Sequence, residues 1–201
     1  IHDISPGIPS PPLDVNAPCL MFLWVHHAES LLLRPCPQKG GVRRPPMQLS
    51  GLVSSGLGRA HVFMAQPHYQ EQFRALLGKT AWPGTLNVAV DGHDLVEYIA
   101  LRKKSGIDTL DASSEDRLAA GNVDVESFEA HRIRGFLRDG VSFGGATAYI
   151  AEFKTDEGNI PCALLIPDLT RHIDVVEIIA GACLRELFNL EDGATVHIEL
   201  K

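Results

Sequence analysis

Short apolar runs fill the C-terminal part of the chain, and they constrain the fold more strongly than any other feature of the sequence. The runs lie at 131–137, 141–153, 160–167, 175–180 and 194–200. Glycine, proline and charged residues separate them, as is typical of short β-strands. In the last run Val196, Ile198 and Leu200 alternate with polar residues, which predicts a strand with one buried face. Many short strands with few helices favour a mainly-β fold, either a closed barrel or a sandwich.

The segment before these strands is predicted to mix strands with helices. The expected elements are strands at 47–53, 61–65 and 85–90, a helix at 68–78 and, further along the chain, a short helix at 183–190. Tyr69 and Phe73 have helical spacing, and Gly78 suits the end of that helix. Residues 91–130 are polar and charged, with a helical tendency at their start. They are expected to form an insertion over the surface.

Proline density sets the first 46 residues apart from the rest. Nine of the 13 prolines precede residue 47, where they hinder both helices and sheet ladders. The chain opens on Ile1, and Met47 directly precedes the first strand-like run. The sequence therefore predicts a disordered leader over 1–46, which is either an extension of the protein or upstream sequence not native to the folded unit, and a single domain over 47–201.

Charge and cysteine usage narrow the class of protein. The formal net charge is −7, and it belongs to residues 47–201, because the leader holds four Lys and Arg against three Asp and Glu. An acidic body argues against nucleic acid as a partner. The 4 cysteines form no CxxC pair, which predicts reduced thiols and a cytoplasmic location. The apolar run 19–25 is too short to span a bilayer, so no membrane segment is predicted.

A glycine-containing loop, SSGLGRA at 54–60, follows the first expected strand. Gly56 and Gly58 allow backbone N–H groups to approach phosphate oxygens, because glycine has no Cβ and tolerates a positive φ. An ordinary turn between two strands is the alternative interpretation. The loop lacks the third glycine of G-x-G-x-x-G and the Gly-Lys-[Ser/Thr] of a P-loop, so it supports neither of those nucleotide-binding motifs.

Two polar side chains share a face of the strand expected at 85–90. Thr85 and Asn87 point to the same side because side chains alternate along a strand. Mg²⁺ prefers hard oxygen ligands and keeps several waters alongside substrate phosphates, so this neutral pair suits the ion only together with a polyphosphate. Ordinary strand polarity is the alternative.

An acidic residue, Glu177, stands in the otherwise apolar run 175–180. It is either a ligand-facing carboxylate or an acid at the water-exposed rim of the fold, because burying an unpaired carboxylate is costly. The next stretch turns into a short helix, whose free N–H groups can accept an anion. Arg185 in that helix is either a phosphate contact or a surface charge. The histidines show no metal-ligand spacing, and no Gly-x-Ser-x-Gly motif occurs.

Taken in order, seven stretches of the chain resemble the archaeal CTP-dependent riboflavin kinases. They are SGLG (55–58), HYQEQFRALLG (68–78), WPGTLNV (82–88), SFGG (142–145), LIPDLT (165–170), VVEIIA (175–180) and LRELFNLEDGATVHIEL (184–200). The resemblance covers roughly 47–90 and 131–201. It implies a six-stranded β-barrel of the cradle-loop type. It also implies phosphoryl transfer from CTP to the 5′-hydroxyl of riboflavin, which yields FMN and CDP. The protein is expected to act as a monomer.

The same resemblance implies which residues form the site. The nucleotide-binding positions would be Gly56, Leu57, Gly58, Arg59, Ala60 and His61 in the glycine loop, and Ala182, Cys183, Leu184 and Arg185. Thr85 and Asn87 would hold Mg²⁺, and Thr170 and Glu177 would bind the flavin. Glu177 is also the best candidate to orient or deprotonate the riboflavin hydroxyl.

Three features depart from the family pattern. The family loop runs SGLGEG, whereas here Arg59 replaces the acid and Ala60 the last glycine. The spacing from Thr170 to Glu177 is one residue shorter, and the segment 91–130 is longer. Two other classes of function stay open. One is a catalytically weak nucleotide- or flavin-binding module, which the loop changes favour. The other is a barrel that binds a macromolecule, which the acidic charge disfavours.

Overall fold

The computed structural model describes residues 46–56, 58, 60–170 and 172–201. All of these residues belong to the compact unit 43–201. The leader predicted for 1–46 lies outside the described residues except for Pro46, as do Leu57, Arg59 and Arg171. Among the helices of the described residues, none is long and apolar enough to cross a membrane.

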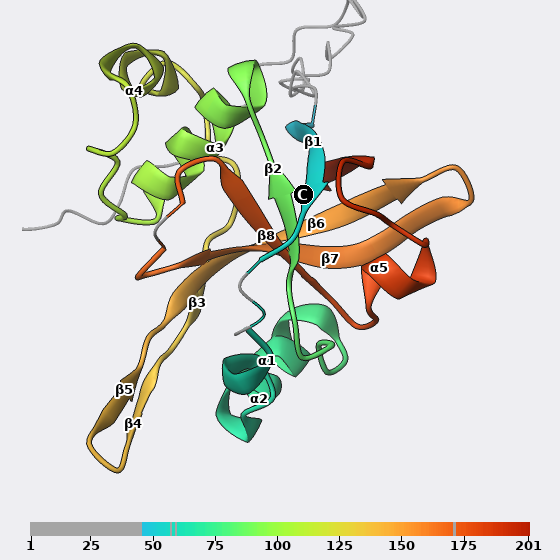
Figure 1. The fold of residues 1–201 in the computed structure, drawn as a ribbon. Coiled ribbons are helices and arrows are strands. Elements are labelled where there is room, and N and C mark those ends of the chain that lie inside the picture. Colours follow the sequence, from blue (N-terminus) through green and yellow to red (C-terminus); the bar gives the residue numbers. More distant parts are fainter. Residues whose placement is uncertain (1–45, 57, 59, 171) are drawn as a thin grey trace, which may run out of the picture. The chain divides into compact units, whose positions relative to one another are not determined.

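The described strands form a closed barrel and a separate hairpin (Figure 1). They are β1 (Gln48–Ser54), β2 (Leu86–Ala89), β3 (His131–Ile133), β4 (Phe136–Arg138), β5 (Val141–Phe143), β6 (Ala146–Thr155), β7 (Gly158–Pro167), β8 (Val175–Ala180) and β9 (Thr195–Leu200). The order β6-β7-β8-β2-β1-β9 closes on itself, because β9 also pairs with β6. Every pairing is antiparallel. The predicted mainly-β, six-stranded barrel is confirmed.

Strand β6 is long enough to pair with two strands along one edge. Its first residues pair with β3, from Ala146 to Ala148, and its later residues pair with β9, from Ala151 to Lys154. The chain between β3 and β6 forms the β4–β5 hairpin, which stands outside the barrel. The hairpin starts and ends in glycines. A Cβ on Gly135 would lie 2.2 Å from the carbonyl oxygen of Phe143, so the two chains approach this closely only because the residue is glycine.

The helices are α1 (Ala60–Met64), α2 (Pro67–Leu77), α3 (Gly92–Lys104), α4 (Ser114–Ala120) and α5 (Leu184–Leu187). The strand predicted at 61–65 is wrong, because this segment forms α1. A helix places Ala60 and Met64 on one side, four residues apart, and both pack into the same apolar cluster. The prediction of α2 is confirmed: Tyr69 and Phe73 are buried, and Gly78 ends the helix with a φ of 73°.

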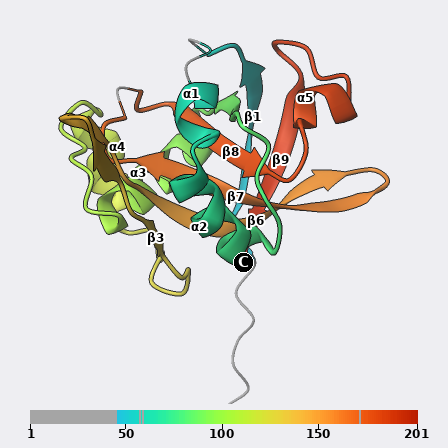
Figure 2. The same cartoon turned by 90° about the horizontal axis from the view of Figure 1, so that it is seen from below.

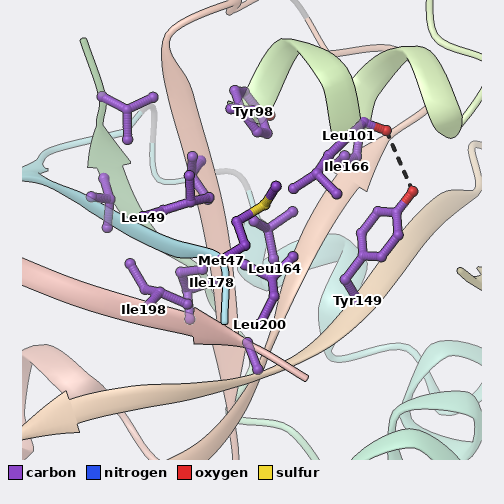
Figure 3. Close-up of a cluster of buried hydrophobic side chains, with 14 of the residues drawn as sticks. Met47, Leu49, Tyr98, Leu101, Tyr149, Leu164, Ile166, Ile178, Ile198 and Leu200 are labelled. Carbon is purple, nitrogen blue, oxygen red and sulfur yellow. Dashed lines mark hydrogen bonds between the residues drawn. The ribbon is translucent and has the colours of Figure 1, made fainter. Parts of the chain in front are cut away.

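The barrel interior is filled by alternate side chains of the strands (Figure 3). In β9 the predicted alternation is confirmed, since Val196, Ile198 and Leu200 are buried. Helix α3 adds Tyr98 and Leu101 to this cluster. The hydroxyl of Tyr149 on β6 donates a hydrogen bond to the carbonyl oxygen of Leu101, at 3.4 Å (Figure 3).

Part of the segment 91–130 therefore does not run over the surface as expected. Helix α3 is buried from Tyr98 to Arg102, although its last turn carries three cationic residues. Five consecutive residues make more than one full turn, so the helix is buried around its whole circumference here. The charged residues on either side of this turn in the sequence hid its burial. Figure 1 shows α3 and α4, in green, apart from α1 and α2, in teal.

A second apolar cluster covers the outer face of several barrel strands. Helices α1 and α2 contribute Met64, Tyr69 and Phe73, which pack against residues of β3, β6, β7 and β8. Figure 2 shows α1 and α2 lying across these strands. Strands β7 and β8 are thus covered on both faces, which explains their nearly continuous apolar sequences. The candidate site lies on this outer face.

Candidate functional site

Two pockets adjoin one another on the outer face of the barrel. The first, here called the polar pocket, is lined by Ser54, Ser55, Gly56, Gly58, Ala60, His61, Gly84, Thr85, Asn87, Glu177 and Arg185. The second, the apolar pocket, is lined by Ala60, Phe63, Met64, Tyr69, Phe73, Thr85, Ile133, Gly144, Gly145, Ala146, Leu165, Pro167, Leu169 and Glu177. Their cavity volumes are about 390 and 350 Å³, within the range of small-molecule sites. Thr85, Glu177 and Ala60 line both pockets and mark their junction.

The predicted shared face of Thr85 and Asn87 is confirmed. The Thr85 hydroxyl donates a hydrogen bond to Oδ1 of Asn87, at 3.1 Å. Both side chains lie opposite Leu86 and Val88, which are buried in the barrel interior. Asn87 pairs directly across strands with Glu177 on β8. Two neutral oxygens and a carboxylate thus stand next to each other on the wall of the polar pocket.

The glycine loop packs against this wall. A Cβ on Gly56 would lie 2.4 Å from Nδ2 of Asn87, so the absence of a side chain at position 56 makes room for the asparagine. Gly58 has a φ of 66°, a conformation that strains residues with a Cβ. Its carbonyl oxygen lies 2.7 Å from Nδ1 of His61. The loop is therefore shaped around the polar pocket, while Leu57 and Arg59 lie outside the described residues.

Glu177 points away from the barrel interior, as predicted from the alternation of β8. Its neighbours Val176 and Ile178 are buried in the inner cluster, and Glu177 lines both outer pockets. Burial raises the pKa of its carboxyl group, and the nearby His172 partly opposes this effect. No other described residue makes a hydrogen bond or an ion pair with it. A largely buried carboxylate that has no such partner among the described residues, and that faces a pocket, is a candidate functional group.

The stretch 182–185 lies beside the polar pocket. Leu184 belongs to the barrel core. Ala182 and Cys183 line a small cavity of about 60 Å³, which is below the size of a ligand site but adjoins the polar pocket through Arg185. Nη2 of Arg185 donates hydrogen bonds to the carbonyl oxygen of Ser54, at 2.8 Å, and to Oδ1 of Asp192, at 2.7 Å. Arg185 is thus part of the pocket wall and not a free surface charge.

Thr170 lines neither of the two pockets, as is also true of Ala182, Cys183 and Leu184, and it does not border the small cavity that those three line. Its hydroxyl donates to the carbonyl oxygen of His172, at 3.3 Å, and its neighbour Leu169 lines the apolar pocket instead. The spacing between Thr170 and Glu177, one residue shorter than the family pattern, is the sequence feature that set this position apart. Its role in flavin binding stays a prediction.

Aromatic residues of the apolar pocket were missed in the sequence. Phe63, Tyr69 and Phe73 come from α1 and α2. Behind them Phe136 and Phe143 of the hairpin stack at 4.5 Å between ring centroids, and Phe63 meets Phe143 edge to face at 5.8 Å. The Tyr69 hydroxyl donates to the carbonyl oxygen of Gly144. The sequence analysis missed this aromatic wall because it predicted a strand at 61–65. A strand there would not place Phe63 over the outer face of the barrel.

Metal binding has to be judged from the donor types on the pocket wall. The described residues contain no cluster of three or more His, Cys, Asp and Glu that could hold a metal ion. The adjacent oxygens of Thr85 and Asn87 fit a Mg²⁺ ion that takes its other ligands from phosphates and water. Cys162 and Cys183 are both free thiols.

A comparison with protein-family models identifies the family of the chain. The model labelled CTP-dep_RFKase, described as "Domain of unknown function DUF120", matches residues 53–121 and 107–200. The chain belongs to the CTP-dependent riboflavin kinase family. The matched residues include the glycine loop, the polar strand β2 and β8 with Glu177.

Three relatives illustrate the similarity within this family. Riboflavin kinase of Methanoculleus marisnigri is 36% identical over 153 residues, covering 76% of this chain and 56% of that protein. Riboflavin kinase of Thermoplasma acidophilum is 33% identical over 152 residues, with the same two coverages. Riboflavin kinase of Sulfurisphaera tokodaii is 30% identical over 160 residues, covering 79% of this chain and 98% of that protein. The chain thus spans about half the length of the first two relatives and nearly all of the third.

Proposed function

We propose that this chain transfers the terminal phosphoryl group of CTP to the 5′-hydroxyl of riboflavin, yielding FMN and CDP. Family membership supports the reaction, and so do the names of the relatives. The observation that carries the proposal is the junction of the two pockets at Thr85 and Glu177. A phosphoryl donor and an acceptor that occupy adjoining pockets meet there, and phosphoryl transfer depends mainly on such positioning.

The apolar pocket suits the isoalloxazine ring of riboflavin. Its wall is largely aromatic and aliphatic, with Phe63, Tyr69 and Phe73 on one side and Leu165 on the other. Flat aromatic ligands gain from burial and from offset or edge-to-face contacts with such rings. With the ring in this pocket, the ribityl chain extends toward the junction, where Glu177 can accept a hydrogen bond from its terminal hydroxyl.

The polar pocket suits the triphosphate of CTP. The backbone N–H groups around Gly56 and Gly58 can approach phosphate oxygens, and Arg185 supplies a cation in a chain that is acidic overall. Mg²⁺ bound by Thr85, Asn87 and the phosphates would neutralise charge that develops on the transferred group. These groups stabilise and orient the nucleotide without forming a covalent bond to it.

Glu177 is suited to act on the riboflavin hydroxyl. Its pKa is raised because burial disfavours the charged form. A carboxylate with a raised pKa takes up a proton more readily near neutral pH than an ordinary glutamate does. In this proposal Glu177 orients the attacking hydroxyl and accepts its proton as the bond to phosphorus forms.

The direct test is an assay of the purified chain with riboflavin, Mg²⁺ and each of CTP, ATP, GTP and UTP in turn. Chromatography separates riboflavin from FMN and CTP from CDP. We expect equal amounts of FMN and CDP with CTP, and far less product with the other nucleotides or with EDTA in place of Mg²⁺. Binding of both ligands without FMN would instead support the alternative, a catalytically weak nucleotide- and flavin-binding module, which the changes at Arg59 and Ala60 favour.

We also propose that the chain works as a monomer in the cytoplasm. The free thiols of Cys162 and Cys183 suit a reducing compartment. Light scattering during size-exclusion chromatography of the active protein measures the oligomeric state directly.

A further inference from the structure

Asp192 lies outside both pockets, in the turn between α5 and β9, yet it holds two residues that line the polar pocket. Its Oδ1 accepts a hydrogen bond from Nη2 of Arg185, at 2.7 Å. The hydroxyl and the backbone N–H of Ser55 also face this carboxylate and stabilise its charged form. These contacts, those to Ser55 first, hold the pKa of Asp192 below its usual range, so the carboxylate is ionised at neutral pH.

The turn that carries Asp192 is itself fixed to the end of β1. The backbone N–H of Gly193 donates to the carbonyl oxygen of Val53, and the N–H of Val53 donates to the carbonyl oxygen of Ala194, both at 2.8 Å. Gly193 has a φ of 87°, which lets the chain turn at this point. The carboxylate of Asp192 therefore has a defined position at the place where the glycine loop leaves β1.

Arg185 makes a second contact at the same place. Its Nη2 donates to the carbonyl oxygen of Ser54 as well as to Asp192. Its Nε and Nη1 have no partner among the described residues, and the side chain lines the polar pocket. The carboxylate of Asp192 thus fixes Arg185 and the first residues of the glycine loop relative to each other. The Nε and Nη1 donors of Arg185 stay free of other described residues.

We propose that Asp192 is a positioning residue that holds Ser55 and Arg185 in the geometry needed to bind the phosphates of the nucleotide. The identity of that nucleotide, CTP, rests on the proposed function; the positioning of the loop does not. The charge of Asp192 alone would act in the opposite direction, because a carboxylate near a triphosphate repels it and partly neutralises Arg185. A positioning role and a charge effect therefore predict opposite changes in nucleotide affinity.

The test compares Asp192→Ala and Asp192→Asn with wild type. Isothermal titration calorimetry measures the Kd for MgCTP, and steady-state kinetics gives kcat/KM for CTP and KM for riboflavin. For Asp192→Ala we expect kcat/KM for CTP to fall by about 10- to 100-fold, with weaker MgCTP binding and an unchanged KM for riboflavin. Asp192→Asn retains an oxygen that can accept from Ser55, so it should recover part of the loss.

Glu199→Gln is the matched control. This carboxylate forms an ion pair with Lys154, at 2.7 Å, and lines neither pocket. Removing its charge should leave kcat/KM for CTP and the Kd for MgCTP unchanged. The control separates a local effect of Asp192 from the loss of one negative charge by the protein as a whole.

Hydrogen exchange of the ligand-free protein separates this proposal from the proposed function. We expect faster amide exchange between Ser55 and His61 in Asp192→Ala than in wild type, with unchanged exchange in the other barrel strands. This measurement does not need turnover, so it tests the positioning even if the wild-type chain makes no FMN. Tighter or equal binding of MgCTP by Asp192→Ala, or unchanged exchange of the loop, would overturn the proposal.

Discussion

At the residue scale, the site depends on which side of a strand a side chain occupies. Glu177 and Asn87 face the outer pockets, whereas Ile178 and Val88 face the barrel interior. This separation follows from the alternation of side chains along a strand, and it is why the sequence alone predicted the orientation of both polar residues. It also implies that the polar side chains can be changed without disturbing the packed core.

The double variant Thr85→Ala/Asn87→Ala tests the proposed metal ligands. We expect it to abolish Mg²⁺-dependent FMN formation, because the neutral oxygens that would hold the ion next to the phosphates are removed. Riboflavin binding, followed by quenching of flavin fluorescence, should remain measurable. The melting temperature should change little, since neither side chain belongs to the core. Unchanged FMN formation by this variant would remove both residues as ligands.

Glu177→Gln tests whether the carboxylate positions riboflavin or also accepts its proton. Loss of a charge-assisted hydrogen bond should weaken riboflavin binding by about 1.5–3 kcal/mol. If Glu177 is also the general base, kcat at saturating CTP and riboflavin should fall by about 10²–10⁴. A lower riboflavin affinity with a normal kcat would assign the residue to positioning alone. Wild-type values of both would contradict any role in the site.

The same variant has a predicted effect on stability that depends on pH. The pKa of Glu177 is raised in the folded protein, so between its unfolded and folded pKa values the folded state binds more protons than the unfolded state. Stability from this group is therefore present below the unfolded pKa and is lost as pH rises through the folded pKa. Glu177→Gln should be at least as stable as wild type at neutral pH. The difference in the free energy of unfolding between the variant and wild type should shrink as the pH is lowered. Urea unfolding at several pH values measures this.

At the scale of secondary-structure elements, the sequence predicted strands better than helices. The period-two pattern located β1, β2, β8 and β9 within one or two residues. The segment of α1 is five residues long, which is too short to distinguish the helical period of 3.6 residues from the strand period of two. Helix α3 was misjudged because charged residues dominate the composition of its segment, although the turn from Tyr98 to Arg102 is buried all round. The apolar pocket could not be predicted, because it forms only where α1 and α2 meet the outer faces of distant strands.

The β4–β5 hairpin offers a matched pair of variants at this scale. Phe143 stacks on Phe136 and contacts Phe63, whereas Leu137 on the same hairpin is 72% exposed. Phe143→Ala removes the ring that supports Phe63 at the apolar pocket, so KM for riboflavin should rise several-fold, consistent with the loss of about 0.5–1.5 kcal/mol from an aromatic pair. Leu137→Ala should leave KM unchanged. Equal KM values for the two variants would show that the hairpin does not support the pocket.

At the scale of the described domain, the barrel has two apolar layers, one inside the strands and one on their outer face, and the two layers have different structural roles. The inner layer fills the space enclosed by the six strands, and the outer layer joins the strands to α1 and α2 beside the site. The strand pattern of the sequence predicted a barrel or a sandwich, and the family resemblance implied the closed barrel. The division into two layers was not predicted, because apolar strands that are covered on both faces lose the alternation that would identify each face.

Two adjacent residues of β7 separate these layers experimentally. Leu164 is fully buried in the inner layer, whereas Leu165 belongs to the outer layer and lines the apolar pocket. Leu164→Ala should lower the free energy of unfolding by about 2–5 kcal/mol, because it leaves a cavity in a closed core, while KM for riboflavin stays close to wild type. Leu165→Ala should raise KM for riboflavin with a smaller loss of stability, because its side chain borders space that is already open. Urea unfolding and steady-state kinetics of both variants measure the two effects. The reverse result, with the larger KM change in Leu164→Ala, would place the flavin inside the barrel and contradict the outer site.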